Sequence, residues 1–216
     1  MVKPSEPQGH VIPVTKSARY FTLGPTTFKK GRVLIALHGY GQLPEFFIRK
    51  LGFLADQGWS VIAPEGLHRF YVQGTAGRVG ASWMTKEARE SDILDYVNFL
   101  DGLTSHLNLE EMRPVLLGFS QGVATASRWV ADGHQQFSKL ILWSGVFPPD
   151  FNWSQGGNKL KSMPVDVALG DDDPFFKESL LQDTASVLNA MGVEYRLHRF
   201  SGGHALDEAC LQSMLS

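Results

Sequence analysis

The sequence contains one cysteine, Cys210, and therefore has no means of forming an intrachain disulfide. Its first ten residues, MVKPSEPQGH, lack the apolar centre of a secretion signal. No apolar run approaches the roughly 20 residues that a membrane-spanning helix needs. These absences argue against a disulfide-stabilised secreted protein and against an integral membrane protein, and we expect a cytoplasmic protein.

The chain also lacks a cluster of positive charge. Its 20 Lys and Arg residues are interspersed with 22 Asp and Glu residues, which gives a net charge of −2. A nucleic-acid partner would require basic side chains gathered on one face, so none is predicted. The histidines do not show the spacing of metal ligands and the cysteine stands alone, so we expect no metal and no organic cofactor.

The chain does have enough apolar residues for one core. Hydrophobic residues make up 43% of its 216 residues and charged residues 19%, which is the balance of a globular protein. This length suits one domain better than two. Residues 1–216 are therefore predicted to form a single domain, with a flexible N-terminus over about residues 1–9.

Short apolar runs alternate with longer segments of helical periodicity. Runs without polar alternation predict strands that are buried on both faces. Strands are expected at residues 33–37, 59–64, 114–119, 139–145, 165–170 and 193–200, and helices at 44–57, 91–106, 122–132, 176–191 and 205–215. Two antiparallel strands, at 10–15 and 19–23, are expected before them. The alternation predicts an α/β fold, with a mostly parallel central sheet and helices on both faces.

Four of the predicted strands run directly into reactive or glycine-rich loops. In parallel sheets, ligands bind beyond the carboxyl ends of the strands, so these loops are expected to meet in one active site. The loops are His38-Gly39-Tyr40-Gly41, Ser120-Gln121-Gly122, Asp171-Asp172-Asp173-Pro174 and Ser201-Gly202-Gly203-His204.

The stretch GFSQG, residues 118–122, has the Gly-x-Ser-x-Gly pattern of a nucleophile elbow. A strand that turns at once into a helix strains the corner residue, and its neighbours two positions away must be small. Gly118 and Gly122 meet that requirement. Ser120 is therefore the predicted nucleophile.

A serine hydroxyl needs a general base to remove its proton. His204 follows the last strand in a glycine-flanked loop and is the predicted base, with His68 as a weaker rival, while His38 is expected to orient its own loop. The third member must orient the imidazole. Asp171, Asp172 and Asp173 compete for that role, and the residues alone do not choose among them.

An oxyanion hole needs two backbone N–H groups. The N–H of Gln121, directly after the nucleophile, is one expected donor. The loop after the first long strand offers the other, which we assign to Tyr40. Phosphate binding by this loop is disfavoured, because it has neither a Gly-x-Gly-x-x-Gly pattern nor a phosphate-binding lysine.

In combination, these motifs resemble the α/β-hydrolase superfamily and, within it, the phospholipase/carboxylesterase family that includes the acyl-protein thioesterases. The matching pieces are LHGYGQ (37–42), GFSQG (118–122), LGDDDPF (169–175), FSGGHAL (200–206) and, less closely, ASWM (81–84). The resemblance implies an α/β-hydrolase fold without a separate lid domain. It selects Asp173, just before Pro174, as the triad acid, and it sets Tyr40 and Gln121 at the oxyanion positions.

The implied activity is cleavage of a small carboxylic ester through an acyl-Ser120 intermediate. Acyl thioesterase and lysophospholipase activities are the alternatives, a peptidase is more distant, and a non-catalytic ligand-binding protein on the same fold is the rival from another class. Because family members often associate, the resemblance also suggests a homodimer, although no sequence feature specifies one.

The acyl pocket is expected where the chain departs from the family pattern. Met84 and Thr85 stand where the family usually has Phe and often Asp, and Phe175-Phe176 replaces a valine pair. The predicted pocket residues are Trp83, Met84, Phe175, Phe176 and Tyr71. Residues 68–80 are predicted to form an irregular rim loop, in which Arg69 and Arg78 either contact an anionic substrate or are simply solvated.

Overall fold

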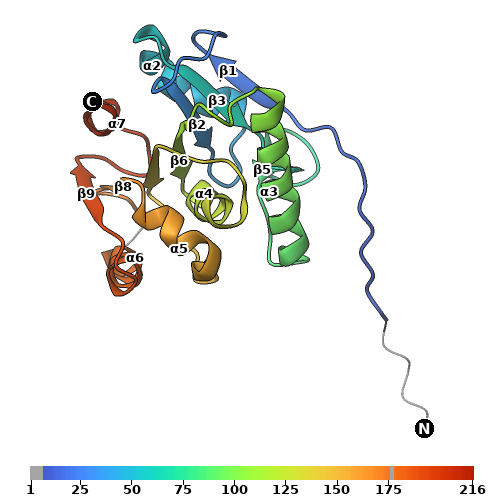
Figure 1. The fold of residues 1–216 in the computed structure, drawn as a ribbon. Coiled ribbons are helices and arrows are strands. Elements are labelled where there is room, and N and C mark those ends of the chain that lie inside the picture. The colour runs from blue at the N-terminus through green and yellow to red at the C-terminus, as the bar shows by residue number, and fades with distance from the viewer. Residues whose placement is uncertain (1–6, 176–177) are drawn as a thin grey trace.

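A computed structural model describes residues 7–175 and 178–216 and is built around a seven-stranded sheet (Figure 1). The strand order is β1-β3-β2-β6-β7-β8-β9, and every neighbouring pair is parallel except β1 with β3. The strands are β1 (Tyr20–Leu23), β2 (Val33–Leu37), β3 (Ser60–Pro64), β6 (Val115–Phe119), β7 (Lys139–Trp143), β8 (Val165–Gly170) and β9 (Tyr195–Phe200). The prediction of a mostly parallel central sheet is confirmed.

Helices cover both faces of this sheet, which explains why its central strands are continuously apolar. The helical elements are α1 (Pro44–Phe47), the 3-10 turn η1 (Ile48–Leu51), α2 (Gly52–Asp56), α3 (Arg89–His106), α4 (Gln121–Asp132), α5 (Trp153–Lys161), α6 (Glu178–Ala190) and α7 (Glu208–Leu215). One core cluster joins the sheet to α3, α4, α5 and α6, and the second joins its other face to α1, η1, α2 and α7 (Figure 1). Successive residues of a strand point to opposite faces of the sheet. Because both faces are covered, every residue of β2 and β6 is buried, and neither strand has a polar side chain.

Two elements predicted from the sequence are absent or divided. Residues 10–15 are exposed and form no strand, because Pro13 lacks the N–H that a sheet ladder requires. The helix expected over 44–57 is divided into α1, η1 and α2. The break falls where Leu51 leaves the helical backbone, at φ −106° and ψ 12°, next to Gly52, which has a low helix propensity. The flexible N-terminus predicted over residues 1–9 lies mostly outside the described residues.

The prediction that residues 68–80 are irregular is wrong in part, because both ends of this segment lie in the paired strands of a β-hairpin. Strands β4 (His68–Tyr71) and β5 (Val79–Ser82) pair antiparallel. Gly74 and Gly77, both at positive φ, allow the chain to reverse between them. A Cβ atom at Gly80 would lie 2.5 Å from the carbonyl oxygen of Gly41, so only glycine lets the hairpin pack against the loop after β2.

The parallel ladder brings the carboxyl ends of β2, β6, β8 and β9 to the same edge of the sheet. The loops that carry Tyr40, Ser120, Asp173 and His204 follow these four ends. Among the described residues, no helix is long and apolar enough to cross a membrane, and no separate lid domain is present.

Close packing between α4 and β2 generates a stability prediction. A Cβ atom at Gly122 would lie 2.3 Å from the Leu37 carbonyl oxygen, whereas a Cβ at Gly102, inside α3, meets nothing within 4 Å. We expect Gly122→Ala to lower the free energy of unfolding by about 3 kcal/mol or more through this clash. The matched change Gly102→Ala should raise it by about 0.5–1 kcal/mol, because alanine is the better helix former. Urea denaturation of both variants measures the difference, and equal effects would contradict it.

Candidate active site

Ser120 occupies the corner between β6 and α4 and has a strained backbone, with φ 55° and ψ −115°. The glycines on either side allow the sharp turn: a Cβ at Gly118 would lie 2.4 Å from the Gly122 carbonyl oxygen. Gly145 matters as well, since a Cβ there would lie 2.3 Å from the Ser120 carbonyl oxygen. The geometry is that of a nucleophile elbow, with the serine half-buried at the top of the sheet.

His204 and Asp173 are joined by a hydrogen bond. The distance from His204 Nδ1 to Asp173 Oδ2 is 2.8 Å, and the Asp173 side chain is fully buried while that of His204 is 19% exposed. Burial by itself would raise the pKa of Asp173. Hydrogen bonds from His204 and from the Phe175 N–H, together with the nearby Ser144 hydroxyl, outweigh burial, so the pKa of Asp173 lies below its usual value.

The structure distinguishes the three adjacent aspartates. Asp171 accepts a hydrogen bond from Arg199 at 2.8 Å, and its side chain is half-exposed. Asp172 is exposed. Only Asp173 bonds to a histidine, as the family resemblance implies.

His204 lies beside the strand that ends at Ser120. Its ring centroid is 4.8 Å from that of Phe119 and 5.1 Å from that of Phe175. Among the described residues, no hydrogen bond joins the Ser120 hydroxyl to His204. In ligand-free enzymes this bond is often long and shortens only when substrate binds. His68, the rival base, begins β4 in the separate β4–β5 sheet and pairs instead with Asp92 at 3.2 Å.

Within the loop after β2, the backbone N–H groups of Gly39, Gly41 and Gln42 have hydrogen-bond partners in the protein, and that of Tyr40 has none among the described residues. The N–H of Gly39 donates to Gln42 Oε1, that of Gly41 to the Ala81 carbonyl, and that of Gln42 to the Gly39 carbonyl. Neither the Tyr40 nor the Gln121 N–H has a partner among the described residues. Gly39 lies against Ser120, since a Cβ built on it would be 3.0 Å from the serine Cβ.

Buried side chains hold this loop in place. His38 is fully buried; its Nε2 accepts the Gly66 N–H at 3.0 Å, so Nδ1 carries the proton and donates to the Gly39 carbonyl at 2.8 Å. Burial lowers the pKa of His38 to about 4, despite the Gly39 hydrogen bond and the attraction of Glu65. The imidazole is therefore neutral at pH 7 and has the structural role predicted for it.

Three residues of the site were not assigned a side-chain role from the sequence. Gln42 accepts the Gly39 N–H, and the Gln121 side chain donates to the Met84 carbonyl at 2.9 Å and accepts the Trp83 N–H at 3.1 Å. Ser144 follows β7 at φ 48° and is buried. The presence of both glutamines in the quoted motifs was the available signal, whereas nothing in the sequence distinguished Ser144.

Ser144 acts on Asp173. Its hydroxyl makes no hydrogen bond of good geometry within the described residues, yet it is close enough to lower the pKa of the Asp173 carboxyl. A buried hydroxyl at this position stabilises the carboxylate that orients His204.

The predicted pocket residues do not form one group. Trp83 is fully buried and donates its indole N–H to the His38 carbonyl at 2.9 Å, so it has no exposed surface in this structure and supports the loop after β2. Met84 is half-buried against the core, and Tyr71 is 49% exposed on β4. Phe175 is 73% exposed and contacts the His204 ring. Phe176 lies outside the described residues.

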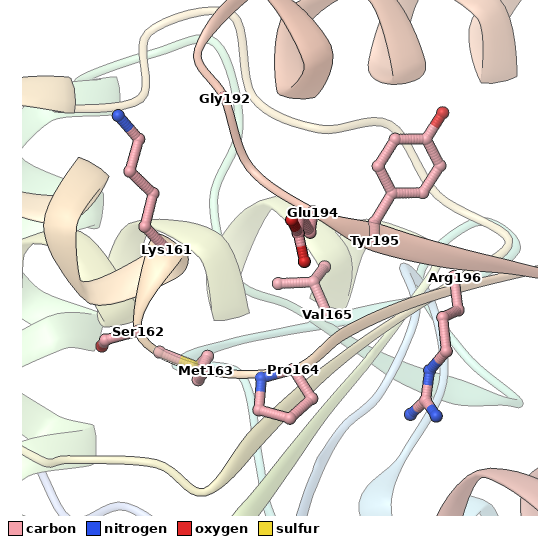
Figure 2. Close-up of a pocket in the computed structure, with 9 residues that line it drawn as sticks. All are labelled: Lys161, Ser162, Met163, Pro164, Val165, Gly192, Glu194, Tyr195 and Arg196. Atoms are coloured by element: carbon pink, nitrogen blue, oxygen red, sulfur yellow. The ribbon is translucent and has the colours of Figure 1, made fainter.

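Three cavities of the structure differ in their position relative to the predicted site residues. One of about 580 Å³ lies at the start of β8 and β9, at the opposite edge of the sheet from Ser120, and no predicted site residue lines it (Figure 2). One of about 540 Å³ is lined by Phe46, Phe47, Lys50 and Arg78. A smaller one, of about 320 Å³, is lined in part by Tyr40. No group of three or more His, Cys, Asp or Glu side chains suited to a metal ion occurs in the described part of the chain.

The chain is similar to a known family and to several solved structures. A family model described as phospholipase/carboxylesterase matches residues 25–216. The solved structure of esterase PE8 shares 22% identity with a TM-score of 0.69 and covers 93% of this chain and 97% of its own. Acyl-protein thioesterase 2 from Zea mays shares 17% identity with a TM-score of 0.71, over 92% of this chain and 96% of its own. A carboxylesterase from Mesorhizobium loti shares 14% identity with a TM-score of 0.71, over 92% of each chain. No curated protein sequence is significantly similar.

The burial of neutral His38 predicts a pH dependence of stability. An unfolded histidine has a pKa of about 6.5, so between pH 6.5 and 4 the unfolded chain binds a proton that the folded chain does not. The free energy of unfolding should therefore decrease as the pH is lowered through this window, by about 2 kcal/mol from pH 6.5 to 5. His38→Gln retains an acceptor for the Gly66 N–H but does not titrate. Between pH 6.5 and 5, its free energy of unfolding should therefore decrease by about 2 kcal/mol less than that of the wild type. Urea unfolding at several pH values measures both slopes; parallel slopes would rule out this origin.

The contact between Ser144 and Asp173 predicts a change in activity. Ser144→Ala should lower kcat about tenfold, because a hydrogen-bonding group facing a buried carboxylate is lost. The pKa of Asp173 should rise, so the acid-side loss of activity should begin at higher pH. The control Ser127→Ala also removes a buried hydroxyl, but one that bonds only to the Val123 carbonyl, and its pH–rate profile should match the wild type. Identical profiles for all three proteins would contradict the role of Ser144.

Proposed function

Because the chain belongs to the phospholipase/carboxylesterase family and has the α/β-hydrolase fold, we propose that it cleaves carboxylic esters through an acyl-Ser120 intermediate. The observation that carries the proposal is the 2.8 Å hydrogen bond between His204 and Asp173. Asp173 follows β8 and His204 follows β9, two and three strands from the strained Ser120 corner, and the His204 ring lies beside Phe119. This is the arrangement of an oriented base next to a nucleophile.

In the first step, His204 Nε2 removes the Ser120 hydroxyl proton as Oγ attacks the ester carbonyl carbon. The carbonyl oxygen becomes an oxyanion, which the free N–H groups of Tyr40 and Gln121 stabilise. The intermediate collapses as the bond to the leaving alcohol breaks, and His204 returns the proton to that alcohol. Asp173 stays ionised throughout and stabilises the imidazolium.

In the second step, water replaces the alcohol. His204 removes a proton from the water, whose oxygen attacks the acyl carbon in the same oxyanion environment. Collapse breaks the acyl–Oγ bond, the proton passes to Ser120, and the carboxylic acid leaves. Neither step requires a group outside the polypeptide and water.

Acyl thioesterase or lysophospholipase activity is a second candidate, supported by the 540 Å³ cavity. Its walls include the aromatic rings of Phe46 and Phe47, and the cations Lys50 and Arg78 line it as well. An apolar cavity beside positive charge suits an acyl chain with an anionic head group. Comparing an oxygen ester with the matching thioester of the same acyl group distinguishes the candidates. Homodimer formation and a cytoplasmic location stay predictions.

The proposal is tested by intact-mass measurement after incubation with a fluorophosphonate. One adduct is expected on the wild-type chain and none on Ser120→Ala, since the probe reacts only with an activated serine. Hydrolysis of a short acyl ester should fall by roughly four orders of magnitude in Ser120→Ala, and by a similar factor in Asp173→Asn, which favours the wrong imidazole tautomer.

Ser127→Ala is the matched serine control and should retain both the adduct and the activity. An adduct that persists on Ser120→Ala, or a folded wild-type chain that takes none, would contradict the proposed nucleophile.

A further inference from the structure

A cavity of about 320 Å³ adjoins the proposed oxyanion hole. Tyr40 lines it, and so does Ser82, whose hydroxyl accepts a hydrogen bond from the Gln121 side-chain amide at 3.0 Å. The backbone N–H groups of Tyr40 and Gln121 are the two proposed oxyanion donors. The cavity therefore begins next to the position of the ester carbonyl, and its volume is at the lower end of the range for ligand pockets, about 300–1,000 Å³.

The strands that precede the lining residues of this cavity indicate that it binds the acyl part of the substrate. Tyr40 follows β2 and His68 follows β3, whereas His204 follows β9, on the opposite side of β6 in the strand order. The leaving alcohol must face His204, because the histidine protonates it. The acyl substituent then projects to the other side of Ser120, toward β2 and β3.

Two aromatic rings supply the apolar part of the lining. The ring centroids of Tyr40 and Phe70 are 5.1 Å apart with planes inclined by 31°, and Tyr40 is 60% exposed. Exposed aromatic side chains offer flat apolar contact area at low conformational cost. A ring in the acyl group would stack against them.

Polar side chains line the rest of the cavity. Asp92 pairs with His68 Nε2 at 3.2 Å and accepts the Thr85 N–H at 3.2 Å, which holds its carboxylate at the wall. The Glu87 carboxylate has no hydrogen bond or ion pair within the described residues, so it is available to a ligand.

The charges around the cavity select an uncharged ligand. Glu87 and Asp92 would repel an anionic acyl group. A cationic group would meet the Arg69 guanidinium, which lies 3.5 Å from Glu65. A hydroxyl group suits both the carboxylates and the cationic side chains, because it donates to a carboxylate and accepts from a guanidinium or imidazole N–H.

We propose that this cavity binds the acyl group of the ester and that this group is an uncharged ring carrying a hydroxyl. The proposal rests on the proposed function and adds the class of acyl group. A site that pairs with a substrate hydroxyl discriminates against the analogue without it, since the analogue cannot make that hydrogen bond.

The test compares the methyl ester of phenylpropanoic acid with that of its para-hydroxy analogue, two substrates that differ in one hydroxyl. The wild-type kcat/KM should be about tenfold higher for the para-hydroxy ester. The double variant Glu87→Leu/His68→Phe should bring the ratio of the two kcat/KM values close to one, mainly by slowing the para-hydroxy ester.

The matched control is Glu110→Leu/His134→Phe, which makes the same two changes at exposed positions, one after α3 and one beyond the far end of α4. It should keep the wild-type ratio. A wild-type ratio of one or less, or an unchanged ratio in the double variant, overturns the acyl-site proposal. So does fluorophosphonate labelling of Ser120 in a chain that hydrolyses neither ester, whereas absence of labelling contradicts the proposed function itself.

Discussion

The close contact of α4 with the ends of β2 and β6 is the constraint on which the rest of the site depends. Gly118 and Gly122 let the helix begin directly at the end of the strand, with the Gly122 backbone against the Leu37 carbonyl. Only in that position does Ser120 adopt its strained φ of 55° and project above the sheet. The same contact presents the Gln121 N–H at the start of the helix, so the proposed nucleophile and one proposed oxyanion donor come from one turn of chain.

The second half of the oxyanion site depends on residues distant in the sequence. The loop after β2 is held by His38, by Gln42 and by the β4–β5 hairpin, which approaches it through Gly80 and bridges to it through Ala81. Trp83 bonds to the same loop and to the Gln121 side chain. The hairpin therefore connects the two proposed oxyanion donors, which preorganises them before substrate binds.

The opposite side of the site is built from the loops after β7, β8 and β9. The buried Ser144 hydroxyl and the His204 imidazole both lower the pKa of Asp173. A carboxylate kept ionised in this way can orient a histidine and stabilise its protonated form. Because Tyr40 follows β2 and His204 follows β9, the proposed acid–base chemistry and the proposed acyl-group recognition occupy separate sides of one sheet edge.

The sequence by itself determined the sheet and the order of its reactive loops, because continuous apolar runs and glycine spacing are local signals that burial on two faces imposes. It also indicated Ser120 and His204, and the family resemblance selected Asp173, although the residues alone left three aspartates open. Only the tertiary structure decided that Trp83 is a buried support, that residues 68–80 contain paired strands and that the buried Ser144 hydroxyl lowers the pKa of Asp173. These outcomes depend on contacts between strands far apart in the chain, and no local pattern encodes which side chain will face which.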